Sequence, residues 1–267
     1  TITVGKNGVA LYAKDSNVTL TGSTINLFGD NSLGLYLDGT TNFSGTGNIN
    51  VNGQNVVLFN MNSSGTVSNN FNVLNVAAGS TYTLGNITNG AFEYTGNSNL
   101  DSNGTLVSGI NSAIYLKGST ITSSAGATNV AAAALDGQYT GTLPSGMTVG
   151  TDGENTGTIT LGDGSAGIYG KNGSRLSNTG IITVGNGSAG LMTSGTGSLT
   201  VNSGTMNIGS GSQGLVLKDG TNIDNTSTGN ILSSGVGTVG IFANNITGNI
   251  NNAGTIDLGG DKSIGIY

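Results

Sequence analysis

The 267-residue chain has no cysteine and no histidine, and only 7% of its residues are charged. The missing histidine and cysteine exclude the commonest general base, a thiol nucleophile and the usual zinc ligands. Seven basic residues against 13 acidic ones give a net charge of −6. This balance argues against a nucleic-acid partner, because phosphate binding needs clustered Lys and Arg. A chain without disulfides suits the cytosol, and equally a protein that crosses a periplasm unfolded.

Proline and long apolar runs are scarce as well. Pro144 is the single proline beside 49 glycines, a ratio that excludes collagen and a proline-rich linker. No apolar run approaches the length that a membrane-spanning helix needs, so we expect no membrane insertion by this segment. The low charge also argues against disorder driven by self-repulsion.

What the chain does contain is a short internal repeat that returns again and again. The phrase GTITLGDGSAGIY at 157–169 returns as GIITVGNGSAGLM at 180–192 and as GTMNIGSGSQGLV at 204–216. Short Gly- and Asn-rich repeats with alternating aliphatic residues are typical of solenoid coils. We predict an all-β, right-handed parallel β-helix of about eleven coils, with a period of about 23–25 residues and three short strands per coil. Residues 1–267 begin and end in mid-repeat, so we expect a single segment cut from a longer rod.

Aligned repeats define the strands of each coil. The first strand alternates aliphatic and polar residues, which sends its aliphatic pairs into the core. Its predicted starts lie near residues 1, 24, 48, 72, 105, 128, 158, 181, 205, 230 and 255. The second strand carries an aliphatic column that we also expect to face inward: Leu11, Leu35, Leu58, Ile114, Ile168, Leu191, Leu215, Ile241 and Ile266.

An aromatic column follows the aliphatic one. Its members are Tyr12, Tyr36, Phe59, Tyr115, Tyr169, Phe242 and Tyr267, with Met192 and Val216 at two positions. Alternation predicts that these rings face outward, together with the small residues two positions earlier, which are mostly glycine. The rings would then stack on one another and cover bare backbone, or form a strip that contacts a sugar or a protein. With the faces reversed, they would fill the core.

An asparagine column precedes the glycine that opens the first strand. It contains Asn155, Asn178, Asn202 and Asn252, with Ser227 at the equivalent site. Stacked amides can donate and accept along a rod, and Asn tolerates the left-handed backbone of tight turns. We interpret this column as structural.

The repeat is irregular between residues 72 and 156. The surplus residues fall in 86–103 and in 136–155, and insertions in a solenoid emerge as loops that often carry recognition. Aromatic faces and acidic acceptors in these stretches suit a sugar or a protein hot spot. The candidate binding residues are Phe92, Tyr94, Tyr139, Asp152 and Glu154. The alternative is a loop that merely varies in length.

Carboxylates offer one enzymatic alternative. Asp15 and Asp38 lie one coil apart, and Asp152, Glu154 and Asp163 are close in sequence. A carboxylate pair is the machinery of a glycosidase, so a polysaccharide hydrolase or lyase on a β-helix stays open as a second function. Scattered turn residues are the other interpretation of the same acids. We expect no catalytic residue, metal site or cofactor.

The phrase GTIxLGxxSxGIY, with its NTG or NAG lead-in, resembles the passenger domains of bacterial type V autotransporters. More narrowly, it is similar to the very large outer-membrane adhesins of fusobacteria, over residues 1–71, 104–121 and 157–267. The resemblance implies a monomeric rod on the bacterial cell surface, extending from the outer membrane. It further implies attachment to a host-cell glycan, a receptor protein or a partner bacterium. The matching repeats are scaffold, so no functional residue carries over, and a pure spacer remains a further alternative.

Overall fold

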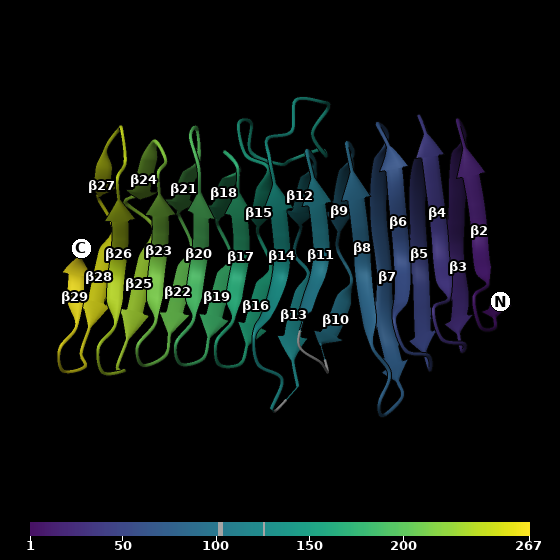
Figure 1. Ribbon diagram of the computed structural model, residues 1–267, viewed down its shortest axis with the longest axis horizontal. Coiled ribbons are helices and arrows are strands. Elements are labelled where there is room, and N and C mark those ends of the chain that lie inside the picture. The colour runs from purple at the N-terminus through teal and green to yellow at the C-terminus, as the bar shows by residue number, and fades with distance from the viewer. Residues whose placement is uncertain (101–103, 125) are drawn as a thin grey trace.

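The computed structural model describes residues 1–100, 104–124 and 126–267. These residues form a right-handed parallel β-helix of about eleven turns, with no helix among them (Figure 1). Three parallel sheets run along the rod, and the two termini lie at its opposite ends. The predicted fold class is therefore confirmed.

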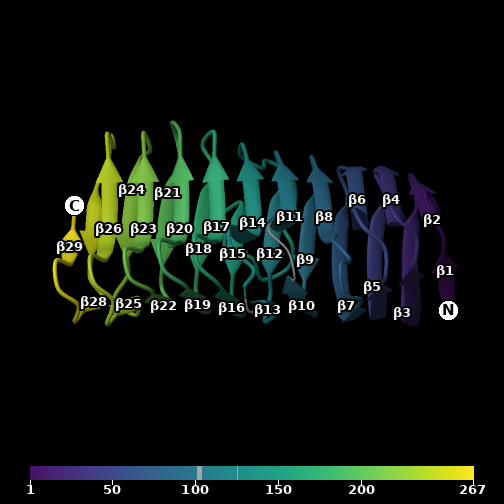
Figure 2. The ribbon, with the colours of Figure 1, turned by 60° about the horizontal axis from the view of Figure 1, so that its bottom comes forward.

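Each sheet takes one strand from successive turns. The front sheet, nearest the viewer in Figure 1, contains β2 (Val9–Lys14), β4 (Leu33–Gly39), β6 (Val56–Ser63), β8 (Tyr82–Thr88), β11 (Gly104–Ile110), β14 (Val130–Asp136), β17 (Ala166–Lys171), β20 (Ala189–Ser194), β23 (Gln213–Lys218), β26 (Val239–Asn244) and β29 (Ile264–Ile266). The back sheet contains β1 (Ile2–Val4), β3 (Asn17–Leu27), β5 (Asn42–Val51), β7 (Thr66–Val76), β9 (Ala91–Tyr94), β12 (Ala113–Leu116), β15 (Gly153–Asn155), β18 (Arg175–Asn178), β21 (Leu199–Asn202), β24 (Asn222–Asn225) and β27 (Ile250–Asn252). The lower sheet, best seen in Figure 2, contains β10 (Asn97–Leu100), β13 (Thr120–Ser123), β16 (Thr158–Leu161), β19 (Ile181–Val184), β22 (Thr205–Ile208), β25 (Asn230–Ser233) and β28 (Thr255–Leu258).

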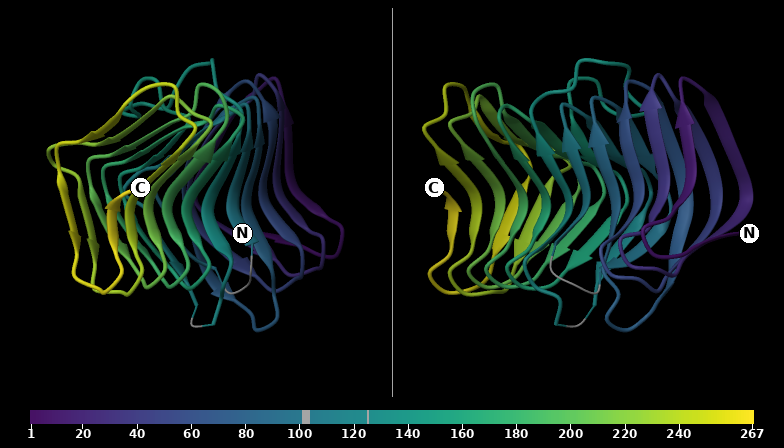
Figure 3. Two further views of the ribbon diagram at one scale, coloured as in Figure 1. Left: turned by 60° about the vertical axis from the view of Figure 1, so that its left-hand side comes forward. Right: turned by 45° about the vertical axis from the view of Figure 1, so that its right-hand side comes forward.

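The outline of the coil changes along the rod. The strands β3, β5 and β7 run without interruption for 11, 10 and 11 residues. From β9 onward the same stretch is divided into a back strand and a lower strand, which gives the predicted three strands per coil. Figure 3 shows this bent outline repeated from turn to turn.

One core fills the rod. The lower-sheet residues Ile159, Ile182 and Ile231 are completely buried, and so are the front-sheet residues Ile168 and Leu191. The inward direction predicted for both aliphatic columns is therefore confirmed at these positions. Each side chain packs against the neighbouring turns, and this contact holds a solenoid together.

The glycine column faces inward, which corrects the predicted outward direction. A Cβ on Gly167 would lie 2.8 Å from Ile182 Cγ2, and one on Gly214 would lie 2.7 Å from Ile231 Cγ2. Strict alternation fails because the glycine and the aliphatic residue after it both face the core. At Gly167 and Gly214 the absent side chain leaves room for an isoleucine of the lower sheet, and Ala132 occupies the same position in β14.

The starts predicted at residues 105 and 128 are wrong. Thr105 lies in β11 of the front sheet, and Thr128 lies in the turn before β14. The lower strands of those turns are β10 and β13, in which Asn97 pairs with Thr120. The stretch 86–103 is accordingly no insertion within its described part, because its residues belong to β8, β9 and β10. Residues 101–103 lie outside the described residues.

The asparagine column forms a buried ladder at the corner between the back and lower sheets. Asn155 Nδ2 donates to Asn178 Oδ1 at 2.8 Å, and Asn178 donates to Asn202 at 2.9 Å. Asn202 then donates to Asn225, so Asn225 and not Ser227 is the equivalent residue. The turn after Asn225 is longer than its counterparts, which displaces Ser227 from the column. None of these asparagines adopts a left-handed backbone, so their role lies in the hydrogen bonds of their side chains.

Candidate functional site

One insertion interrupts the regular turns, between the front strand β14 and the back strand β15. Hydrogen-bonded partners in neighbouring turns have a sequence separation of 35 for Val130 and Ser165, but of 23 for Asp152 and Arg175. The surplus corresponds to Gln138–Val149, which we call the lid. The lid projects beyond the line of turns at the top of Figures 1 and 3. The predicted insertion at 136–155 is therefore present.

An ion pair fixes the base of the lid. Arg175, the single arginine of the chain, contacts Asp152 through Nε at 2.9 Å and through Nη2 at 2.6 Å. The Asp152 carboxylate is completely buried, and it also accepts hydrogen bonds from the backbone N–H groups of Tyr139 and Arg175, each at 2.8 Å. The hydrogen bond to Asp152 raises the pKa of Arg175. This two-pronged geometry is that of a strong, orienting ion pair.

A second carboxylate holds the far half of the lid. Glu154 projects from the outer face of β15 and is 2% exposed. Its two oxygens accept hydrogen bonds from the backbone N–H of Thr148 at 2.6 Å and from the Thr148 hydroxyl at 2.8 Å. Both ends of the lid are thus tied to acidic residues of the coil beneath it.

A small apolar cluster lies under the lid, separate from the main core. It contains Ala91, Ala113, Tyr115, Tyr139 and Met147. The Tyr115 hydroxyl donates to the carbonyl of Gly146 at 3.2 Å, and burial raises the pKa of Tyr139. The lid is therefore a packed element with its own cluster of buried side chains.

A lysine ties the same part of the lid to β9. Lys117 Nζ donates to the carbonyl of Ser145 at 3.1 Å and pairs with Glu93 at 3.1 Å. The ammonium also lies 5.6 Å from the centre of the Tyr115 ring. Lys117 thus connects the lid, the apolar cluster beneath it and the neighbouring turn.

All five candidate binding residues have buried side chains. Phe92 and Tyr94 lie in the main core, where Phe92 packs edge to face on Phe59 at 5.6 Å. Tyr139, Asp152 and Glu154 come together at the lid, as the sequence placed them, and they hold it in position. Tyr139 also lines a groove beside the lid, and the hydrogen bonds of Tyr139, Asp152 and Glu154 support a role in positioning the lid. A part in binding stays a prediction.

The aromatic column is discontinuous, and two of its predicted members do not belong to it. Phe59 occupies the inward position that pairs with Leu35, because β6 is displaced by one residue against the predicted alignment. Tyr115 lies in the back sheet, where it is covered by the lid. The residues that replace these rings along the column are Asn60, Asn86, Ser108 and Ala134.

Rings remain stacked near each end of the rod. Tyr12 stacks on Tyr36 at 5.5 Å, and Phe242 stacks on Tyr267 at 5.2 Å. Tyr169 stays in the column, and Tyr12 and Tyr267 are 60% and 64% exposed. The column therefore provides two separate aromatic patches, and no continuous strip joins them.

The candidate carboxylates Asp15, Asp38 and Asp163 contact residues of neighbouring turns. Asp15 accepts a hydrogen bond from the backbone N–H of Thr40 at 3.0 Å, and Asp38 pairs with Lys14 at 3.7 Å. Asp163 accepts one from the backbone N–H of Asn186 at 2.7 Å. In the described part of the chain, no three acidic residues gather in a way that could hold a metal ion.

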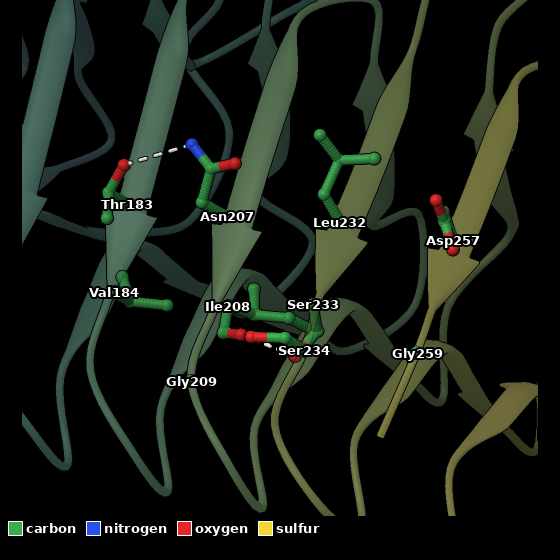
Figure 4. A pocket seen from close by; sticks show the side chains of 10 residues that line it. All are labelled: Thr183, Val184, Asn207, Ile208, Gly209, Leu232, Ser233, Ser234, Asp257 and Gly259. Atoms are coloured by element: carbon green, nitrogen blue, oxygen red, sulfur yellow. Dashed lines mark hydrogen bonds between the residues drawn. The ribbon is translucent and has the colours of Figure 1, made fainter.

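Two grooves were not predicted. The larger, about 600 Å³, lies on the outer face of the lower sheet, where Thr183, Asn207, Leu232 and Asp257 project from four neighbouring strands (Figure 4). Asn207 donates to the Thr183 hydroxyl at 3.2 Å along this row. The second, about 350 Å³, lies beside the lid. Sequence alone could not place either groove, because each depends on how turns lie beside one another.

No family model, curated protein or solved structure matches this chain. Across residues 1–100, 104–124 and 126–267, no helix is long and apolar enough to cross a membrane. Arg175, which holds the base of the lid through Asp152, was not among the residues predicted at this site. Its signal was its position, one ordinary coil step after Asp152.

Proposed function

We propose that this chain is a non-enzymatic adhesin segment, a monomeric rod on the bacterial cell surface that presents the lid to a host-cell glycan, a receptor protein or a partner bacterium. The resemblance of its repeats to type V autotransporter passenger domains supports this proposal. The observation that carries it is the lid, which makes the longest connection among the described turns. Solenoids place recognition in insertions that emerge from one face.

The coil does not need the lid in order to close. In the next turn, the ordinary connection is Asn172–Gly173–Ser174. Removing Gln138–Val149 would leave Gly137–Gly150–Thr151 in the same place. Gly137 and Gly150 have φ values of 86° and 85°, against 54° and 90° for Asn172 and Gly173. All four lie in the left-handed region, so the shortened turn can adopt the neighbouring geometry.

The test compares beads coated with the wild-type chain and beads coated with the variant lacking Gln138–Val149. Both proteins are first checked by circular dichroism and by thermal unfolding, and we expect the same β signal and a similar unfolding temperature. Beads carrying the wild type should bind host cells or partner bacteria, and the shortened variant should bind at least tenfold fewer. The control is the chain with Tyr12, Tyr36 and Tyr169 changed to phenylalanine. These changes remove the hydroxyl groups of the aromatic column and keep its rings, so this variant should bind as the wild type does.

Three results would contradict this assignment. Unchanged binding after lid removal, with loss after Tyr12, Tyr36 and Tyr169 are changed to serine, would move the site to the aromatic column. Unchanged binding after both changes would place the site elsewhere in this segment, and no binding by the wild type would make the segment a spacer. Cleavage of a polysaccharide that Asp15→Asn or Asp38→Asn abolishes would make the protein a hydrolase or lyase.

A further inference from the structure

A polar groove lies where the lid meets the turns of the preceding coils. Its walls are Ser64, Asn89 and Asn111, from three consecutive turns between the front and back sheets, and the first residues of the lid, 138–141. We call it the lid groove. Its volume of about 350 Å³ falls at the lower end of the range for small-molecule sites.

Two amides in the lid groove have no internal partner. Asn89 and Asn111 have exposed side chains and left-handed backbones, with φ values of 59° and 47°. Within the described part of the chain, neither side chain makes a hydrogen bond. At the same turn in later coils the equivalent amides are engaged, since Asn172 donates to Asp136 and Asn245 to Asp219, each at 2.6 Å. In the lid groove, the side-chain amides of Asn89 and Asn111 therefore face solvent without the hydrogen bonds that Asn172 and Asn245 make.

The lid groove carries no formal charge. None of its lining residues is ionisable below neutral pH, and the ionised groups near its base are paired: Asp152 with Arg175 and Asp136 with Lys171. A charged ligand would lose hydration there without gaining a counter-charge. Each amide offers both a donor and an acceptor, and this combination matches a ligand rich in hydroxyl groups.

We infer that the lid groove binds an uncharged sugar residue through Asn89, Asn111 and Gln138. Gln138 comes from the lid itself and lines the groove, and its Nε2 donates to the carbonyl of Gly173 at 2.9 Å, so its Oε1 keeps its capacity to accept. The inference rests on the proposed function, because it names the ligand class of the surface that the lid creates.

The test uses free neutral, acidic and amino monosaccharides and disaccharides as probes, with binding measured by saturation-transfer difference NMR. The variant is Asn89→Gly combined with Asn111→Gly, because glycine keeps the positive φ and removes only the amide. Asn245→Gly is the matched control, since it alters the same turn (φ 52°) in a distant coil. We expect a neutral sugar to bind the wild type and the control, and to bind the double variant at least tenfold more weakly.

Several outcomes would overturn the inference. These are binding of charged sugars alone, equal binding by the double variant, or no sugar binding by the wild type. The bead assay separates this failure from that of the proposed function. If the wild type attaches to cells through the lid but binds no sugar, the adhesin assignment stands and its ligand is a protein surface. If the wild type neither attaches nor binds a sugar, both are wrong.

Discussion

At the scale of single residues, the buried asparagines show how one side-chain type closes a turn and joins it to the next. Asn178 Nδ2 donates to the carbonyl of Gly180 in its own turn at 3.2 Å and to Asn202 Oδ1 of the next turn at 2.9 Å. Asn202 repeats the pattern with Gly204 and Asn225. Because every buried amide needs a partner, the amides follow one another without a break from Asn155 to Asn252, and Leu116 occupies this position in the turn before Asn155.

We predict that Asn202→Ala lowers the free energy of unfolding by about 2 kcal/mol. The buried side-chain oxygen of Asn225, Oδ1, loses the amide that donates to it, and the side-chain amide of Asn178 loses one acceptor. Urea denaturation measures the change. Asn62→Ala, at an exposed position, is the control, for which we expect a change of about 0.5 kcal/mol or less. Equal effects of the two substitutions would show that the ladder adds nothing to stability.

Because Tyr94 is buried, we predict that the folded chain loses stability at alkaline pH. Burial raises the pKa of Tyr94 in the folded chain far above the value of about 10 that it has when unfolded. Above pH 10 the unfolded state therefore binds fewer protons than the folded state, and stability falls as the pH rises, by about 1.4 kcal/mol per pH unit for this group. Urea midpoints between pH 9 and 11.5 should fall more steeply for the wild type than for Tyr94→Phe. Parallel curves would contradict the assignment.

At the scale of elements, the front strands β4, β17, β20, β23 and β26 place an inward glycine next to an inward aliphatic residue. In β17, β23 and β26 the glycine lies against an isoleucine of the lower sheet. A Cβ at Gly214 would lie 2.6 Å from the carbonyl oxygen of Gly240 and 2.7 Å from Ile231 Cγ2. At Gly265, in the same column of the last turn, a Cβ would meet no atom within 4 Å. The column thus contains its own matched control.

We predict that Gly214→Ala lowers the free energy of unfolding by about 1–3 kcal/mol, because the backbone of the next turn must move to admit the methyl group. Gly265→Ala should leave it within about 0.5 kcal/mol of the wild type. Thermal unfolding of the two variants decides the point. If Gly214→Ala proved as stable as Gly265→Ala, the glycine would be dispensable and the inward direction of the column would be wrong.

The ion pair between Arg175 and Asp152 fixes the base of the lid, so Arg175→Met should loosen it. The variant leaves the fully buried Asp152 without a cation, and we expect a loss of about 3–5 kcal/mol in stability together with faster amide exchange across 138–152. Hydrogen-exchange mass spectrometry reads both. The double variant Arg175→Met with Asp152→Asn should recover part of the protection. Unchanged exchange in the single variant would show that the lid is held by its apolar cluster alone.

The coils could be predicted from the sequence, because residues one period apart lie side by side in neighbouring turns and have similar side chains. The columns through Ile168 and Leu191 and through Asn178 and Asn202 followed from that rule. Alternation failed where two consecutive residues face inward, which misdirected the glycines. It failed again at β6, where Leu58 takes the place of the glycine and Phe59 takes the place of the aliphatic residue.

The candidate site was predicted only as a segment. Sequence located 136–155 as an insertion and picked Tyr139, Asp152 and Glu154 from it. It could not show that these side chains are buried, since that follows from the fold of the lid on the back sheet. Asn89 and Asn111 went unnoticed because turn asparagines are common in this chain, and only their missing partners distinguish them.

At the scale of the whole molecule, stability is distributed over the rod. Each turn packs and hydrogen-bonds only with its two neighbours, so a local change is felt locally. The asparagine ladder, the glycine column and the aliphatic columns all run through several turns, so each turn is joined to the next one along the rod. The lid follows the same rule, because Lys117 of the preceding turn and Arg175 of the following turn both donate hydrogen bonds to it.

The inter-turn hydrogen bonds lie along the rod, since the strands cross its axis, and the two termini lie at its opposite ends (Figure 1). Tension applied through the termini therefore loads these bonds a few at a time, and turns should detach one after another at modest force. An ordinary turn would release about 8 nm of chain and the longer lid turn about 12 nm, at the reach of an extended backbone. In force spectroscopy of single molecules we expect a series of equal extensions interrupted by one longer step, which marks where along the tether the lid sits. A single abrupt extension would show that the rod yields as one unit.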